Sequence, residues 1–229
     1  MPTPYSHLSL AHSCGSRLGI SNNDFYLGAI MPDVRYFTKQ PRDKTHFSID
    51  HLNYIKDNIE VSQSFFLGYS IHLIIDDVWY NPMTLQYFKA LVPFVFRNKV
   101  SLKMMEAIVE FYCLNLRPAN VQLQSNENEL TQYLDIQHKY IQEAVETMQE
   151  YNKYRSMQIG FQIAMDAGIA SVDRLSTMKK LAQKIEHPIG RHIALFIIKY
   201  PTSRLYNTIV DQVVERIQSS LSIKHQGQS

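Results

Sequence analysis

Apolar residues recur at intervals of three and four along most of the 229-residue chain. This spacing is typical of a helix with one buried face, whereas a half-exposed strand alternates apolar and polar residues. Only 8 glycines and 9 prolines interrupt the pattern, so long helices can form between them. The sequence therefore predicts an all-α fold, a bundle of several helices.

The expected helices are the segments of strongest periodicity, with their ends set by polar residues and proline. They are 6–18, 48–62, 64–80, 84–96, 101–114, 127–154, 157–180, 191–199 and 203–223. The helix over 64–80 is the clearest, because it is mostly apolar and is followed by Asn81 and Pro82. A loop is expected through residues 22–24, and Pro32 should interrupt any helix and leave Asp33 on a turn.

The polar stretch over 118–128 is the one plausible internal boundary. We expect a metal-binding helical region over 1–120. A C-terminal helical region over 121–229 is expected to pack on the first, as additional helices of one continuous domain or as a separate part.

Composition narrows the classes of function. Hydrophobic residues make up 45% of the chain, enough for a substantial core. The net charge is only +2 and the basic residues are scattered, so no specific nucleic-acid binding is expected. The sequence shows no secretory signal and no apolar run long enough to span a bilayer. Cys14 and Cys113 belong to no CxxC pair, and we expect a cytoplasmic protein with reduced thiols.

Histidines are concentrated near the beginning of the sequence. Five of the nine precede residue 80, namely His7, His12, His46, His51 and His72. His72 and Asp76 are four residues apart, about one helical turn, so they share a face of the expected helix, whereas Asp77 points elsewhere. Because that helix is largely apolar, both side chains need partners, and a divalent cation would satisfy both. A surface pair, or a carboxylate held by an arginine, is the alternative interpretation.

Three further residues on separate elements could complete a metal site. His7 lies near the start of the first helix, Asp33 on the turn after Pro32, and His46 after a polar loop. With His72 and Asp76 they offer enough ligands for one metal, or for two that share a carboxylate. Each alone has a structural interpretation, because single histidines often satisfy local partners and a turn aspartate often caps backbone amides.

Metal-assisted hydrolysis is the chemistry that such a site favours. A bound cation lowers the pKa of its water from near 16 to about 7 and stabilises charge on a phosphoryl oxygen. Arg35 and Arg42 lie close in sequence to the candidate ligands and could hold a phosphate. Solvated loop charges are the other interpretation of these two arginines.

The order of these residues resembles that of the zinc-dependent phospholipase C-like family, whose fold is related to that of the S1/P1 nucleases. The matching segments are His7, residues 28–33, residues 45–47, and residues 66–69 leading into His72 and Asp76, about the first 80 residues. The resemblance implies a helical fold of this type, in which zinc ions cleave phosphodiester bonds in phospholipids or related substrates.

The resemblance also implies roles for single residues. Asp33, His46 and His72 would hold one zinc ion, His7 a second, and Asp76 would bridge the two. Asp33 would in addition orient or deprotonate the attacking water. The family's third zinc site needs a glutamate four residues after a histidine, and here Gln142 follows His138, while His187 and His192 lack one. We therefore expect Zn²⁺ as one or two ions, and Mn²⁺ or Fe²⁺ would accept the same ligands.

The expected function is a metal-dependent hydrolase of phosphate esters, a phospholipase C-like phosphodiesterase that acts on a small phosphate ester or a phospholipid. A lipid substrate favours an exposed apolar rim, for which Phe37, Phe47, Trp79 and Tyr80 are candidates, although residues at helical spacing more often lie in the core. An HD-type phosphohydrolase fits less well, because no His-Asp dipeptide occurs. The alternative class is a non-catalytic helical protein with a structural or vestigial metal site and a partner-binding C-terminal half.

Overall fold

A computed structural model describes residues 4–82, 84, 86, 121–125, 129–154, 183 and 203–219. Within these residues the chain forms helices and no strand, so the prediction of an all-α fold is confirmed. The expected helices 101–114, 157–180 and 191–199, most of 84–96, and the single residues Cys113, His187 and His192 lie outside the described residues. No helix among the described residues is long and apolar enough to cross a membrane.

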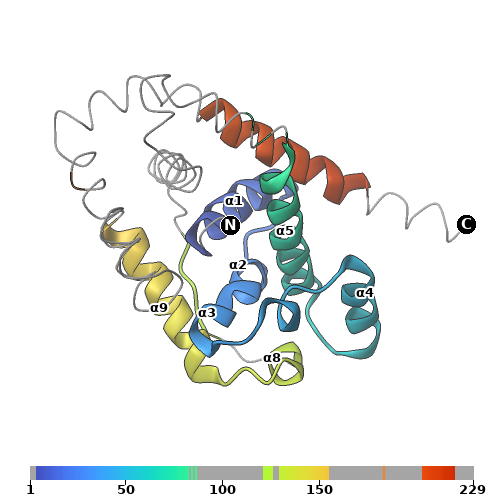
Figure 1. The fold of residues 1–229 in the computed structure, drawn as a ribbon, viewed down its shortest axis with the longest axis vertical. Helices are drawn as coiled ribbons and strands as arrows, with labels where there is room; N and C mark the ends of the chain where they lie inside the picture. The colour runs from blue at the N-terminus through green and yellow to red at the C-terminus, as the bar shows by residue number, and fades with distance from the viewer. Residues whose placement is uncertain are drawn as a thin grey trace, which may run out of the picture.

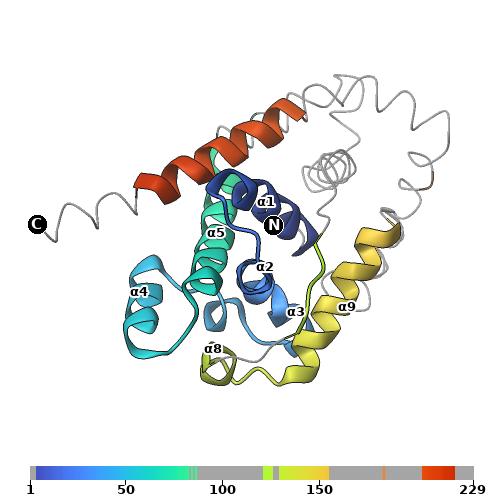
Figure 2. The same cartoon turned by 180° about the vertical axis from the view of Figure 1, so that it is seen from behind.

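Nine helical elements are labelled in the described part of the chain. They are α1 (Pro4–Leu18), α2 (Asn23–Ile30), η1 (Met31–Val34), α3 (Arg35–Thr38), η2 (Arg42–Lys44), α4 (Ile49–Asn58), α5 (Gln63–Tyr80), α8 (Glu129–Tyr133) and α9 (His138–Tyr154). Residues 203–219 form a further helix. Helices α1, α2 and α5 lie at the centre, with α4 on one side, α9 on the other, and helix 203–219 across α1 and α5 (Figures 1 and 2).

Asn22 sets the start of α2, and Pro32 sets its end. The Oδ1 atom of Asn22 accepts a hydrogen bond from the Phe25 amide at 2.9 Å and caps the helix. The expected loop over 22–24 is therefore shorter, because Asn23 and Asp24 belong to the first turn of α2. At the other end Pro32 has no amide to continue the helix, and the 3₁₀ turn η1 that follows carries Asp33.

The single helix expected over 127–154 is wrong, because the chain breaks into α8 and α9. Leu134 and Ile136 lie in the break and are both buried. Two residues apart on one helix they would point to nearly opposite faces, and the break allows both to reach the core. Asp135 between them adopts a left-handed conformation with φ of 53°, and the Ile136 amide donates to the Thr131 carbonyl at 2.9 Å.

The backbones of α2 and α5 touch at two glycines. A Cβ atom on Gly28 would lie 2.0 Å from the Phe65 carbonyl oxygen, and one on Gly68 would lie 1.9 Å from the Phe25 carbonyl oxygen. Real Cβ atoms do not approach a backbone oxygen so closely. Only glycine at both positions therefore permits this crossing of the two helices.

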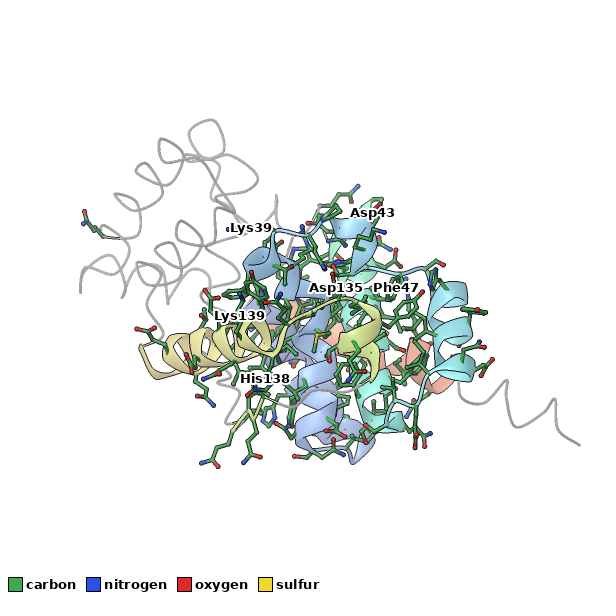
Figure 3. The ribbon with its side chains drawn as sticks, turned by 90° about the horizontal axis from the view of Figure 1, so that it is seen from below. Lys39, Asp43, Phe47, Asp135, His138 and Lys139 are labelled. Atoms are coloured by element: carbon green, nitrogen blue, oxygen red, sulfur yellow. The ribbon has the colours of Figure 1, made fainter. Side chains whose placement is uncertain are left out.

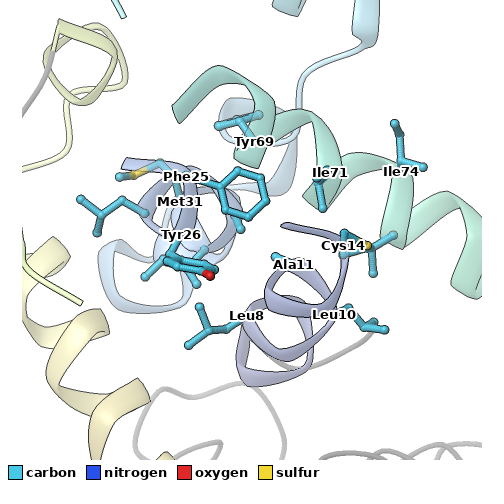
Figure 4. Close-up of a cluster of buried hydrophobic side chains, with 14 of the residues drawn as sticks. Leu8, Leu10, Ala11, Cys14, Phe25, Tyr26, Met31, Tyr69, Ile71 and Ile74 are labelled. Atoms are coloured by element: carbon cyan, nitrogen blue, oxygen red, sulfur yellow. The ribbon is translucent and has the colours of Figure 1, made fainter. Parts of the chain in front are cut away.

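The apolar core surrounds this crossing. Figure 4 shows side chains of α1, among them Leu8 and Ala11, facing Phe25 of α2 and Ile71 of α5. Each of these four side chains is at most 2% exposed. The core therefore fixes α1 against the α2–α5 pair, which is a condition for bringing polar groups of all three helices together.

Helix 203–219 packs against α1. The buried Tyr206 donates a hydrogen bond through its hydroxyl to the Ser9 carbonyl at 2.8 Å. Arg17 pairs with Asp211 at the surface, an arrangement that contributes little to stability in water. The buried contact therefore accounts for more of the docking of this helix than the ion pair does.

We predict that Gly68→Ala lowers the free energy of unfolding by about 2 kcal/mol or more, because the new methyl group must push α2 and α5 apart. On an ordinary helix the same change stabilises by about 0.5–1 kcal/mol, so the sign is diagnostic. Urea denaturation measures it. Gly19→Asn is the control, because Gly19 has a φ of 72° that asparagine tolerates and no neighbour within 4 Å. A stabilised Gly68→Ala variant would contradict the close crossing.

Candidate metal centre

The five predicted metal ligands come together in the interior. We call His7, Asp33, His46, His72 and Asp76 the five-residue cluster. His7 comes from α1, Asp33 from η1, His46 from the residues after η2, and His72 and Asp76 from α5. His7 and His72 are 0% exposed, Asp33 1% and Asp76 5%, so the cluster gathers polar side chains where water does not solvate them.

His72 is oriented by a backbone carbonyl. Its Nδ1 donates to the Ala29 carbonyl oxygen at 2.8 Å. A carbonyl only accepts, so Nδ1 carries the hydrogen and Nε2 of the neutral ring carries a lone pair. The Nε2 atom of His46 lies 3.3 Å from the Nε2 atom of His72. Two nitrogens bound to one tetrahedral zinc at about 2.0–2.1 Å lie roughly 3.3–3.4 Å apart, which matches the observed spacing.

The carboxylate of Asp76 faces two histidines with different oxygens. Its Oδ1 lies 3.3 Å from His7 Nε2, and its Oδ2 lies 3.6 Å from His46 Nε2. Oδ2 also pairs with Arg42. Asp76 therefore faces His7 with one oxygen, and both His46 and Arg42 with the other.

His7 also contacts the second carboxylate. Its Nδ1 lies 2.9 Å from Asp33 Oδ2, and its ring stacks on that of His72 with centroids 3.6 Å apart. A hydrogen bond from Nδ1 to a carboxylate leaves Nε2 as the ring nitrogen that faces Asp76. His7 therefore lies between the two aspartates and turns a separate nitrogen toward each.

His7 Nε2 and Asp76 Oδ1 form an ion pair at 3.3 Å, whereas Asp33 Oδ1 is buried and makes no hydrogen bond to any described residue. Such a buried oxygen is rare in folded proteins and is costly, and an unobserved ion is one explanation for it. Suitable ligand atoms form two groups whose members lie within 4.8 Å of one another, His7 with His72 and Asp76, and Asp33 with His46 and His72. The second group is the set that the family resemblance implies for one zinc ion; in the first, His72 joins His7 and Asp76.

The charges in the cluster compensate one another. Burial opposes the charged form of His7, but the carboxylates of Asp33 and Asp76 outweigh this effect and raise its pKa to about 9. Burial lowers the pKa of His46 to about 4 and that of His72 to about 3. Burial opposes ionisation of both aspartates, yet the neighbouring histidines, with Arg42 beside Asp76, hold both pKa values below the usual range. Two carboxylates are therefore ionised in the interior.

The two predicted phosphate-binding arginines occupy different positions. Arg42 contacts the cluster through Asp76, and its side chain is 41% exposed. Arg35 begins α3 and donates from Nη2 to the Tyr36 hydroxyl at 2.7 Å. Its charge contributes to the lowered pKa of His46. Both arginines therefore lie near the cluster, and Arg42 forms an ion pair with it through Asp76.

Two residues that position the cluster are not identified by the sequence analysis. The hydroxyl of Tyr69 donates to the Thr45 carbonyl and holds the segment that carries His46. Tyr69 lies three residues before His72, on nearly the same face of α5, a spacing that could have indicated its role. The Ala29 carbonyl has no sequence signal, because every residue carries one.

Several other candidates lie apart from the cluster. His12 contacts the Tyr26 hydroxyl at 3.0 Å, and His138 contacts Ser125 at 3.5 Å. Among the aromatic residues considered for a lipid-binding rim, Trp79 is buried and Phe37 and Phe47 are partly buried against the core. Tyr80 is 39% exposed. These four residues therefore divide between core and surface.

Comparison with known proteins does not identify a family for this chain. No protein-family model, no curated protein and no solved structure matches the chain. The function must therefore be inferred from the residues of the five-residue cluster and their surroundings.

We predict that the metal-free chain resists urea best near pH 6.5. The pKa of His7 is about 9 when folded against an ordinary 6.5, so its stabilising effect is complete below pH 6.5 and is lost as the pH rises through 9. His46 and His72 have lowered pKa values, so they destabilise the fold as the pH falls below 6.5. The loss on the alkaline side should not exceed about 1.4 kcal/mol per pH unit for one group.

Urea denaturation in the presence of a chelator, from about pH 5 to pH 10, measures both limbs. His7→Gln should flatten the limb above pH 6.5 and leave the acidic limb in place. An unchanged alkaline limb in this variant would assign it to another group.

Proposed function

We propose that this chain is a metal-dependent hydrolase of phosphate esters, with one or two zinc ions held by the five-residue cluster. The observation that carries the proposal is the convergence of three imidazoles and two carboxylates in the interior, where Asp33 Oδ1 makes no hydrogen bond to any described residue. Neutral imidazole and ionised carboxylate are the ligands that zinc prefers in catalytic sites. Manganese and iron accept the same donors.

The donor set fits a metal in its chemistry as well as its spacing. His72 and His46 favour the neutral form, which a metal ligand needs. The Ala29 carbonyl fixes the His72 ring, as outer partners of metal-bound histidines do. When bound, the metal would supply an activated water and an electrophile for a phosphoryl oxygen.

The residues of the chain have separate tasks in this proposal. Asp33 has one oxygen toward His7 and the other, Oδ1, without a hydrogen bond to any described residue. Oδ1 is the atom that would orient the attacking water or accept its proton. Asp76 would bridge two ions. Arg42 lies on the solvent-facing side of Asp76, where a substrate phosphate would arrive.

A phosphodiester is the substrate class that the family resemblance favours. A small phosphate ester and a phospholipid headgroup both contain the required phosphoryl group. Of the aromatic residues considered for a lipid rim, Tyr80 is exposed and Trp79 is buried, which supports a small phosphate ester more than a bilayer lipid.

The second candidate is a non-catalytic protein in which the metal only holds helices together. The observation that favours it is the deep burial of the cluster, since structural zinc sites are closed whereas catalytic sites keep an open position. The partial exposure of Arg42 favours the enzyme, because it places a solvated cation beside the site. Metal binding with turnover supports the hydrolase, and metal binding without turnover supports the structural role.

We predict that Asp76→Asn removes both metal binding and hydrolysis, while Asp77→Asn does not. Asp76 is 5% exposed and contacts two histidines, whereas Asp77 is exposed and pairs with Arg216 at the surface. Zinc affinity of Asp76→Asn should fall by more than the roughly 10- to 100-fold that loss of an outer partner causes. Metal analysis, zinc titration and release of nitrophenol from bis(p-nitrophenyl) phosphate measure the effects. Equal, mild effects of the two changes would refute the assignment.

A further inference from the structure

The element η2 and the two residues after it carry both Arg42 and His46. The Arg42 carbonyl accepts from the His46 amide at 2.8 Å and from the Thr45 amide at 3.1 Å. These bonds fix the backbone of Arg42 relative to His46. Figure 3 shows this side of the molecule, with Asp43 of η2 and Lys39 at the end of α3 labelled on it. One rigid turn therefore sets both a candidate ligand and the cation beside it.

Arg42 occupies the same carboxylate that a bridging metal would need. Its Nη2 pairs with Asp76 Oδ2, and that oxygen also faces His46 Nε2 at 3.6 Å. A guanidinium and a divalent cation held by one buried carboxylate repel each other. Occupation of Asp76 by the two cations is therefore competitive, unless an anion lies between them.

The side chain of Arg42 is much more exposed to solvent than the cluster that it contacts. The side chain of Arg42 is 41% exposed and that of Asp76 6%, so the guanidinium reaches from solvent to a buried carboxylate. An anion that approaches the cluster from this side meets Arg42 first. The planar guanidinium matches the geometry of phosphate oxygens and of carboxylate oxygens alike.

We propose that, when the cluster holds metal, Arg42 leaves its ion pair with Asp76 and instead binds the phosphoryl group of the substrate. The inference rests on the proposed hydrolase function and sharpens its substrate class. The substrate must offer at least two unesterified phosphoryl oxygens, one for the metal and one for Arg42. Phosphate monoesters and diesters satisfy this condition, and phosphate triesters and carboxylic esters do not.

The proposed exchange predicts that removal of the guanidinium changes the affinities for zinc and for phosphate in opposite directions. Removing the guanidinium should strengthen zinc binding, because Asp76 loses a competing cation. The same change should weaken phosphate binding to the zinc-loaded protein, because the anion loses a charge-assisted hydrogen bond. A residue that only supports the fold or orients Asp76 would weaken both.

The test compares the full-length wild type with Arg42→Gln, Arg42→Lys and the control Lys44→Gln. Lys44 is an exposed cation on the same turn, so its replacement matches the change of net charge. Zinc titration of the metal-free proteins and calorimetric titration of the zinc-loaded proteins with inorganic phosphate give the two affinities. Circular dichroism shows that each variant is folded.

Arg42→Gln should bind zinc several-fold more tightly and phosphate at least about tenfold more weakly. Arg42→Lys should retain part of the phosphate affinity, and Lys44→Gln should match the wild type in both titrations. A loss of zinc affinity in Arg42→Gln, or an unchanged phosphate affinity, would overturn the exchange while leaving the metal site intact. A wild type that binds no zinc would overturn the proposed function and this inference with it.

Discussion

The site depends on the close approach of α2 and α5 at Gly28 and Gly68. Each glycine lies against a carbonyl group of the other helix, at a distance that no side chain permits. This approach brings the Ala29 carbonyl of α2 within 2.8 Å of the His72 ring on α5. The same crossing places Asp33, which follows α2 within one short turn, beside the polar face of α5. A contact between two backbones thus determines where the residues of the five-residue cluster lie.

Burial of so many polar groups needs compensation when no metal is bound. Two ionised carboxylates would be very costly in the interior by themselves. His7, whose pKa is raised to about 9, and Arg42, which pairs with Asp76, supply two positive charges against them. Asp33 Oδ1 still makes no hydrogen bond to any described residue. This unsatisfied buried oxygen supports the proposed metal site.

The sequence predicts the local parts of this arrangement better than the distant ones. Helical periodicity alone places His72 and Asp76 on one face of α5, because four residues make about one turn. The convergence of His7, Asp33 and His46 on that face is predicted from their residue types and from a family resemblance, because no local pattern encodes contacts between separate elements. The ion pair of Arg42 with Asp76 agrees with the alternative interpretation of a carboxylate held by an arginine, but no local pattern identifies which arginine pairs with it.

Helix boundaries that depend on neighbouring residues are likewise predicted better than those that depend on packing in the core. The ends of α5 agree with the expected helix because Ser62 caps its start and Asn81 its end. The break between α8 and α9 was missed, since the buried positions of Leu134 and Ile136 depend on a core that the local sequence does not describe. Periodicity identifies residues that prefer the interior, but the path of the chain decides whether one helix can bury them all.

Asp76 and Asp77 have identical side chains, and only their positions on α5 give them different environments. A rotation of about 100° around α5 separates them. It takes Asp77 to an exposed pair with Arg216, worth little because water screens both charges. It takes Asp76 to a buried position between His7, His46 and Arg42. Only the second environment desolvates the carboxylate as the proposed metal site requires, and only there would Arg42 have a buried charge to exchange for a substrate anion.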